Sequence, residues 1–270
     1  MKRLPLRGLT IQQRLPLLIC VLLLGMIVAF GWTSYIEVKQ SAIKAGTGRL
    51  RSLNDQLATM FSQTLKGTLS ATRTAANQES IKSCLRSLNS SCTEATEALQ
   101  KIRVDSTSIL VDLLDAEGDL MLRSSKDSIE KRVDFKSLYA AVKIDSGTVG
   151  KIMKVRDSLY YPFITGVVDN DKIIGYLVRW RIINTTAKAV EQFSQLLGTK
   201  STIYIGNSDQ SLWTDMIKPI PNPVPAGMGA ITDVVHYTST NGNRVLAAEK
   251  QIAGTPWLLL MEVPEGSVME

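Results

Sequence analysis

The stretch that decides the fold is PLLICVLLLGMIVAFGWTSYI, which runs from Pro16 to Ile36. It contains no charged residue and closes with Trp32 and Tyr35, aromatic residues of the kind that settle at a membrane interface. At a rise of about 1.5 Å per residue, a helix of this length crosses the roughly 30 Å hydrocarbon layer of a bilayer. We therefore expect residues 16–36 to form a transmembrane helix.

The residues ahead of this helix predict its orientation. Residues 1–15 carry four basic side chains and no acidic one, so this tail is expected in the cytoplasm and residues 37–270 outside it. A cleaved signal peptide is the alternative, because it also joins a basic start to an apolar run. An uncleaved anchor is favoured, because the run is longer than a usual signal core and no small-x-small cleavage site follows Phe30.

The charge balance argues against nucleic acid as a partner. The formal net charge of +6 is concentrated in the N-terminal tail, and the rest of the chain is close to neutral. Phosphate backbones are bound by a concentrated basic face, and no such cluster occurs in the sequence. The tail charge is better explained as a topology signal at the membrane.

The cysteines fit an extracytoplasmic body. Cys20 lies within the membrane segment, whereas Cys84 and Cys92 flank a polar turn and are close enough in sequence to form a local disulfide in an oxidising compartment. The alternative is a pair of buried thiols. Their spacing is not that of a metal site.

The segment after the membrane helix predicts a long helical stalk. Residues 38–76 are free of proline, and Leu50, Leu53, Leu57 and Met60 continue into Thr64 and Thr68 at heptad-like spacing. This stripe is expected to face either the chain's own domain or a second copy in a homodimer. A shorter helix follows Cys92, with Ala95, Leu99 and Ile102 at helical spacing.

Strand patterns then occur twice in the same order. The first unit has a hairpin over residues 108–124, a helix over 134–143, and strands over 148–155, 159–168 and 172–183. The second has a helix over residues 186–197, a hairpin over 201–214, a proline-rich loop over 218–225, and strands over 230–237, 244–252 and 257–263. The fold class expected is α+β, with two modules carried on one helix.

This order resembles the double Cache (dCache) sensor domains of bacterial receptors, which are PAS-like. VDLLDAEGD (111–119) is similar to their first hairpin, VVDNDKIIGY (167–176) to the turn into their last distal strand, and GTPWLLLMEVP (254–264) to their final proximal strand. The resemblance covers about residues 38–265. It implies two stacked antiparallel sheets, each of five strands, in a protein of the bacterial inner membrane.

The resemblance also implies a division of the chain. We expect a cytoplasmic tail (1–15), a transmembrane helix (16–36), a stalk with a short helix (37–99), a membrane-distal module (100–184) and a membrane-proximal module (185–265). Residues 266–270 would lead toward a second membrane helix. Such receptors continue into a histidine kinase, a cyclase, a diguanylate cyclase or a methyl-accepting domain.

The distal module is where family members usually bind a small molecule. Polar and aromatic candidates for that role are Arg156, Tyr160, Tyr161, Arg179, Trp180 and Arg181. Strand alternation places Arg179 and Arg181 on one face and Trp180 on the other, so only one set can point inward. The amino-acid-binding pattern of the family is not found here, and Arg179-Trp180-Arg181 stands where an acidic residue is common. That departure argues against an amino acid and suggests an anionic ligand such as a carboxylate; the alternative is that these are solvated surface residues.

Catalytic machinery is not apparent in the sequence. The chain has one histidine, His236, in an expected strand, and neither a nucleophile elbow nor a phosphate-binding loop. Asp169-Asn170-Asp171 is the closest approach to a cation site, but this pattern is common turn chemistry. We expect no enzyme in this region and no cofactor or metal. The leading interpretation is ligand sensing; the alternative is an anchored structural or assembly protein whose ectodomain binds partner proteins.

Overall fold

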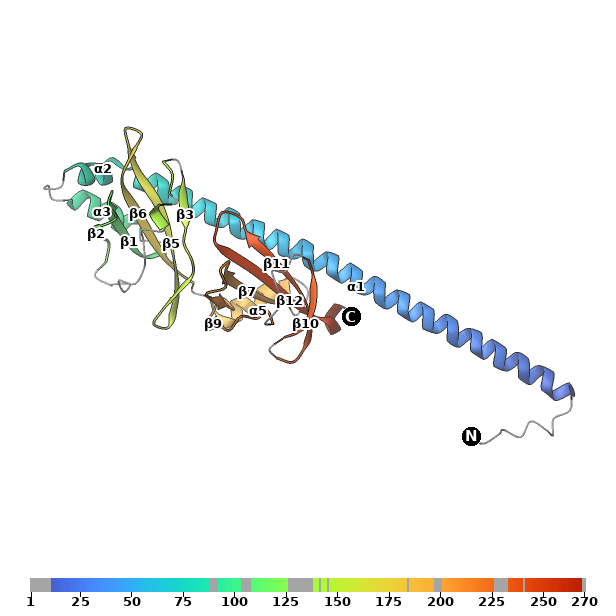
Figure 1. Cartoon of the computed structure of the whole chain (residues 1–270). Coiled ribbons are helices and arrows are strands. Elements are labelled where there is room, and N and C mark those ends of the chain that lie inside the picture. The colour runs from blue at the N-terminus through green and yellow to red at the C-terminus, as the bar shows by residue number, and fades with distance from the viewer. Residues whose placement is uncertain are drawn as a thin grey trace.

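A single helix organises the molecule (Figure 1). The computed structural model describes residues 11–87, 92–102, 108–125, 138–140, 142–144, 146–183, 185–196, 201–225, 233–239 and 241–268. Helix α1 (Ile11–Ala76) is continuous over 66 residues and passes both sheets. It ends at the predicted residue, Ala76.

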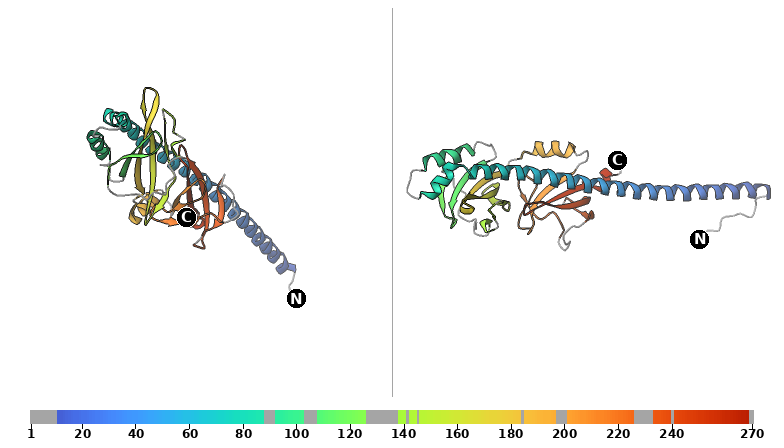
Figure 2. Two further views of the ribbon diagram at one scale, coloured as in Figure 1. Left: turned by 60° about the vertical axis from the view of Figure 1, so that its left-hand side comes forward. Right: turned by 90° about the horizontal axis from the view of Figure 1, so that it is seen from above.

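The first half of α1 projects beyond the rest of the chain (Figure 2). In the described part of the chain it is the one helix long and apolar enough to cross a membrane. The apolar side chains of this half are exposed; Phe30, for example, is 73% exposed and Trp32 is 68% exposed. Such a surface matches lipid, because soluble proteins rarely expose a large continuous apolar patch.

Two antiparallel sheets follow one another along α1. Sheet A has the order β2-β1-β6-β5-β3, with β4 also paired to β5. Sheet B has the order β10-β11-β12-β7-β8-β9. The strands of sheet A are β1 (Ser108–Asp115), β2 (Leu120–Arg123), β3 (Gly147–Val149), β4 (Met153–Val155), β5 (Ser158–Asp169) and β6 (Lys172–Ile183). Those of sheet B are β7 (Thr202–Asn207), β8 (Trp213–Thr214), β9 (Pro219–Ile220), β10 (Val235–Thr238), β11 (Arg244–Ile252) and β12 (Trp257–Pro264).

The smaller helices cover the same faces of the two sheets that α1 covers. Helices α2 (Glu79–Arg86) and α3 (Thr93–Ile102) cover sheet A together with the end of α1, because Ile81 and Leu99 pack against Val111 of β1. The predicted disulfide between Cys84 and Cys92 is formed and joins α2 to the start of α3. Helix α5 (Ala187–Leu196) places Val190 in the core between α1 and sheet B. The 3-10 helix η2 (Glu265–Val268) closes the described chain.

The largest core is shared by α1 and both sheets. Leu57 and Leu65 of α1 pack there with Phe163 of β5 and with Leu259 and Met261 of β12. We call this cluster the junction core. Because one continuous apolar cluster includes α1 and both sheets, the two modules share a hydrophobic core and pack against each other.

The segment between β3 and β4 makes polar contacts between the modules. The backbone N–H of Ile152 donates to Oδ1 of Asn207 and its C=O accepts from Nδ2, each at 2.9 Å. Trp257 Nε1 donates to the C=O of Gly150 at 3.0 Å, and Lys151 pairs with Asp209 at 2.7 Å. We call residues 150–152 the junction loop.

Several sequence expectations need correction. Among the residues that the structure describes, each sheet has six strands instead of five. The strand expected over residues 148–155 is two strands, because the backbone of the junction loop turns to Asn207. Pro219 and Ile220 of the expected proline-rich loop form β9, an edge strand, where the missing N–H of proline is tolerated. Helix α2 was not expected. The helix expected over residues 134–143 lies largely outside the described residues. Residues 230–232, the start of the strand expected over 230–237, also lie outside them.

The stripe on α1 faces the chain's own domain over part of its length. Leu50 and Leu57 are 3% and 6% exposed, whereas Met60 is 45% exposed. The buried residues of α1 instead follow the 3.6-residue period, through Asn54 and Leu65, with Phe61 partly buried between them. Packing against the chain's own sheets therefore accounts for the buried leucines, and dimerisation stays a prediction.

Candidate functional site

The face of sheet A turned away from α1 carries the candidate site. Along β1, Val111 and Leu113 pack toward the helices, so Leu110, Asp112 and Leu114 point to the opposite face. The same alternation along β6 brings Tyr176, Val178 and Trp180 to that face. Leu138 and Val142, from the segment before β3, pack against it. We call this surface the distal face.

A buried carboxylate lies in the middle of the distal face. Asp112 is 1% exposed and accepts two hydrogen bonds from Arg123, from Nε at 2.7 Å and from Nη2 at 3.0 Å. Trp180 Nε1 donates to the same carboxylate at 3.3 Å. The strand register explains the pair, because Arg123 is the cross-strand partner of Asp112.

The ion pair is asymmetric in its exposure. The Asp112 side chain is 2% exposed, whereas that of Arg123 is 27% exposed. Hydrogen bonding to Asp112 raises the pKa of the Arg123 guanidinium. Arg123 thus reaches from solvent to the Asp112 carboxylate. Without Arg123 this carboxylate would be buried without a counter-charge, which strongly destabilises a folded protein.

Tyrosines line the remainder of the distal face. The rings of Tyr139 and Tyr176 stack with centroids 4.9 Å apart, and Tyr139 Oη donates to the C=O of Glu117 at 3.1 Å. Burial raises the pKa of Tyr176, with the neighbouring Tyr139 as a smaller cause. Tyr160 packs on the same cluster. Aromatic faces beside a carboxylate suit recognition of an organic cation or an ammonium group.

The structure divides the six residues proposed as ligand contacts. Tyr160 and Trp180 lie on the distal face, and the predicted separation of Trp180 from Arg179 and Arg181 is confirmed. Arg179 is buried and donates to Ser108 Oγ at 2.7 Å, while Arg181 donates to Thr68 Oγ1 of α1 at 3.0 Å.

The other two candidates also lie away from the distal face. Tyr161 packs in the junction core against Trp257, with ring centroids 4.9 Å apart. Arg156 is exposed in the turn between β4 and β5. An anionic ligand was expected because of Arg179 and Arg181, and both of these arginines face α1. These two side chains therefore do not support an anionic ligand, which stays a prediction.

Two residues of the distal face were not proposed from the sequence. Asp112 is the one charged residue in the interior of the apolar strand SILVDLLD, and Arg123 lies at the matching position of the return strand. A charge inside such a strand is a usable signal, because a buried carboxylate needs a partner.

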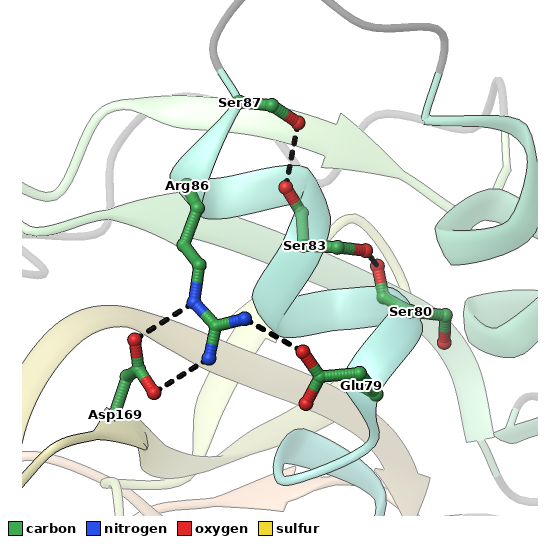
Figure 3. A network of polar contacts seen from close by, with 6 residues as sticks. All are labelled: Glu79, Ser80, Ser83, Arg86, Ser87 and Asp169. Carbon is green, nitrogen blue, oxygen red and sulfur yellow. Dashed lines mark hydrogen bonds and ion pairs between the residues drawn. The ribbon is translucent and has the colours of Figure 1, made fainter.

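The Asp169-Asn170-Asp171 turn has a structural role. Asn170 and Asp171 have positive φ angles of 45° and 57°, as a two-residue hairpin turn requires. Arg86 of α2 donates to Asp169 from Nε at 2.8 Å and from Nη2 at 2.6 Å, and it also donates to Glu79 (Figure 3). These bonds to Arg86 lower the pKa of Asp169. No group of three or more potential metal ligands occurs among the residues that the structure describes.

Comparisons with known proteins identify the architecture. Neither a family model nor a curated protein matches the sequence. Among solved structures, the ligand-binding domain of the Pseudomonas fluorescens chemoreceptor CtaA in complex with L-leucine matches with a TM-score of 0.62 at 13% identity, covering 86% of this chain and 100% of that one. The chain has the double Cache fold.

Two other solved structures are similar to this chain. The ligand-binding domain of the Pseudomonas aeruginosa amino-acid chemoreceptor PctC, in complex with GABA, has a TM-score of 0.58 at 12% identity and covers 81% of this chain and 99% of that one. The extracellular domain of the putative histidine kinase rpHK1S-Z16 has a TM-score of 0.55 at 16% identity, with 84% and 98% covered. The double Cache fold of these structures matches the two modules on one helix predicted from the sequence.

Proposed function

We propose that this chain is the ligand-binding, membrane-anchored portion of a bacterial signalling receptor, and that it senses a small molecule outside the cytoplasm. The fold is shared with ligand-binding domains of chemoreceptors and with the extracellular domain of a histidine kinase. The exposed apolar half of α1 supports a membrane anchor. The basic tail supports a cytoplasmic N-terminus.

The ligand is proposed to bind the distal face. The single observation that carries this is the buried Asp112 carboxylate, held between Arg123 and Trp180. A ligand ammonium group would replace Arg123 as the counter-charge of Asp112, and the released guanidinium would bind a carboxylate of the same ligand. We therefore favour a small amino-acid-like zwitterion over a purely anionic compound.

Calorimetry on the full chain in lipid nanodiscs tests the site. Amino acids, simple amines and organic acids are titrated separately into the wild type and the Asp112→Asn variant. Loss of the buried charge should weaken binding of the amino-acid ligand by about tenfold or more, equivalent to at least 1.4 kcal/mol. Asp171→Asn, a change of the same type at an exposed turn, is the matched control. Unchanged affinity in Asp112→Asn, or binding of organic acids alone, contradicts the proposal.

A homodimer through α1 is proposed as the signalling unit. A small ligand-driven shift of α1 would pass through the membrane as sliding or rotation of two helices. Single cysteines placed between residues 20 and 36, in a Cys20→Ala background, should give ligand-dependent cross-links with helical periodicity. Absence of cross-links at every position contradicts the dimer and leaves the ligand site unaffected.

A further inference from the structure

A cavity lies where α1 meets sheet B, whereas the distal face belongs to sheet A. Its volume is about 100 Å³, and it is lined by Arg51, Asn54, Asp55, Asp233, Val234, Ala248, Glu249 and Lys250. One wall is α1 and the other is formed by β11 and the two residues just ahead of β10. Since one water needs about 10–15 Å³ by this measure, the cavity has room for a ligand of several heavy atoms. We call it the stalk pocket.

The α1 wall presents an unsatisfied amide oxygen. Asn54 is 2% exposed, and its Oδ1 has no hydrogen-bond partner. A buried acceptor without a partner is destabilising, and such an atom in a native protein needs an explanation, for which a bound ligand or water is one. The oxygen can accept a hydrogen bond from a ligand N–H.

Opposite charges flank Asn54 on both walls. Asp55 pairs with Lys250 of β11 at 2.9 Å, and Arg51 pairs with Asp233. The side chains of these pairs are 48% to 65% exposed. Exposed ion pairs contribute little, so their members can exchange partners at small cost.

We propose that the stalk pocket is a second binding site, for a small zwitterion. The carboxylate of such a ligand would bind Arg51 or Lys250, its ammonium group would bind Asp55 or Asp233, and the amide of Asn54 would bind between them. A purely cationic ligand would leave the two basic residues of the lining without a ligand group, and a purely anionic ligand would leave its carboxylates, Asp55, Asp233 and Glu249, without one. The pocket is small enough to exclude zwitterions with large side chains.

Occupancy would strengthen the contact between α1 and sheet B. The ligand would bridge residues of both walls, so it would bind best when α1 lies as it does here, and by linkage it would favour that position. This regulatory consequence rests on the function proposed above, whereas the binding site itself does not.

Glycine is the probe, titrated by calorimetry into the full chain in nanodiscs. The Asp112→Asn variant serves as the background, so that the distal face does not contribute. Binding of glycine is expected, with methylamine and acetate, its two halves, each at least about tenfold weaker. Asn54→Leu fills the amide position with an apolar side chain of similar size and should weaken glycine binding by about tenfold or more.

Controls separate a lost site from a damaged fold. Gln63→Leu makes the same change in chemistry on an exposed turn of α1 and should leave glycine binding unchanged. Asp55→Asn removes one exposed charge and should also weaken binding. No glycine binding, equal binding of methylamine or acetate, or wild-type affinity in both Asn54→Leu and Asp55→Asn overturns the inference. Glycine binding that disappears with Asp112→Asn alone overturns it while supporting the distal site.

Discussion

Substitution of Asn207 should destabilise the contact between the two modules. Asn207 is 1% exposed at the end of β7, and its side chain makes two hydrogen bonds with the backbone of Ile152 and a third with Ser211 Oγ at 3.0 Å. Asn207→Ala removes all three and leaves the N–H and C=O of Ile152 without partners. Ile152 is itself 2% exposed, so water replaces these bonds poorly.

The size of the effect follows from these contacts. Each lost hydrogen bond costs about 1 kcal/mol, and each stranded backbone group adds about 1–3 kcal/mol unless water enters the space left by the amide. Allowing for partial hydration, we expect the free energy of unfolding to fall by about 3–5 kcal/mol. For a chain of this size that corresponds to a fall in melting temperature of roughly 10 °C.

Differential scanning calorimetry of the full chain in detergent measures this change. Asn222→Ala is the control, because it makes the same change at an exposed asparagine and should alter stability by less than about 0.5 kcal/mol. Because Asn207 joins the modules, its loss should also split one unfolding transition into two. An Asn207→Ala protein within about 0.5 kcal/mol of the wild type would refute the reasoning.

Three more outcomes are expected. The ion pair with Lys151 lowers the pKa of Asp209 to about 2, below its ordinary value of 3.8, so the stability it contributes is complete above pH ~4 and is lost as the pH falls toward 2. The difference in melting temperature between wild type and Asp209→Asn should accordingly shrink over that interval and stay constant from pH 5 to 7. The double change Cys84→Ala and Cys92→Ala, which opens a loop with a sequence separation of 8, should lower the free energy of unfolding measured in denaturant by about 2–3 kcal/mol. A flexible Gly-Ser insertion between Ile36 and Leu50 should leave ligand affinity and folding unchanged and abolish signalling in cells, and retained signalling would count against a mechanical role for α1.

Much of the fold was predictable because its strands are strongly patterned. The expected bounds of β1, β6 and β11 coincide with those observed. The strands β1 and β6 are mostly apolar, and β11 begins with an apolar stretch after the turn at Asn241–Asn243, so local preference and tertiary environment agree. The end of α1 at Ala76 was also predicted.

The errors occur where tertiary contacts decide the local structure. Helix α2 has the polar sequence ESIKSCLR and buries only Ile81 and Cys84, so its helical form depends on the disulfide and on sheet A. The break between β3 and β4 is determined by Asn207, which lies 55 residues away from Ile152. Neither cause is visible in a local window of sequence.

Part of the candidate site could be predicted from the sequence. Alternation separated Trp180 from its two arginine neighbours, but which side faces outward depends on where α1 packs. Arg181 was proposed as a ligand contact, and its bond to Thr68 of α1 shows why that face is occupied. The signal for Asp112 is the match between this charged position in β1 and Arg123, its partner in the return strand.

The same alternation provides a mechanical connection through sheet A. Trp180 contacts Asp112 on the distal face, and the next residue of β6, Arg181, contacts α1 on the other face. A ligand that draws the Trp180 side chain toward itself must also move the backbone that carries Arg181. The displacement would be felt by α1 at Thr68 and by the junction core next to it, where Tyr161, the cross-strand partner of Arg181, packs on Trp257. Arg181→Met, which keeps length but removes the donor, should therefore preserve ligand affinity and weaken the response of α1, measured by a fluorophore near residue 40. A response equal to that of the wild type would place the coupling in the junction loop instead.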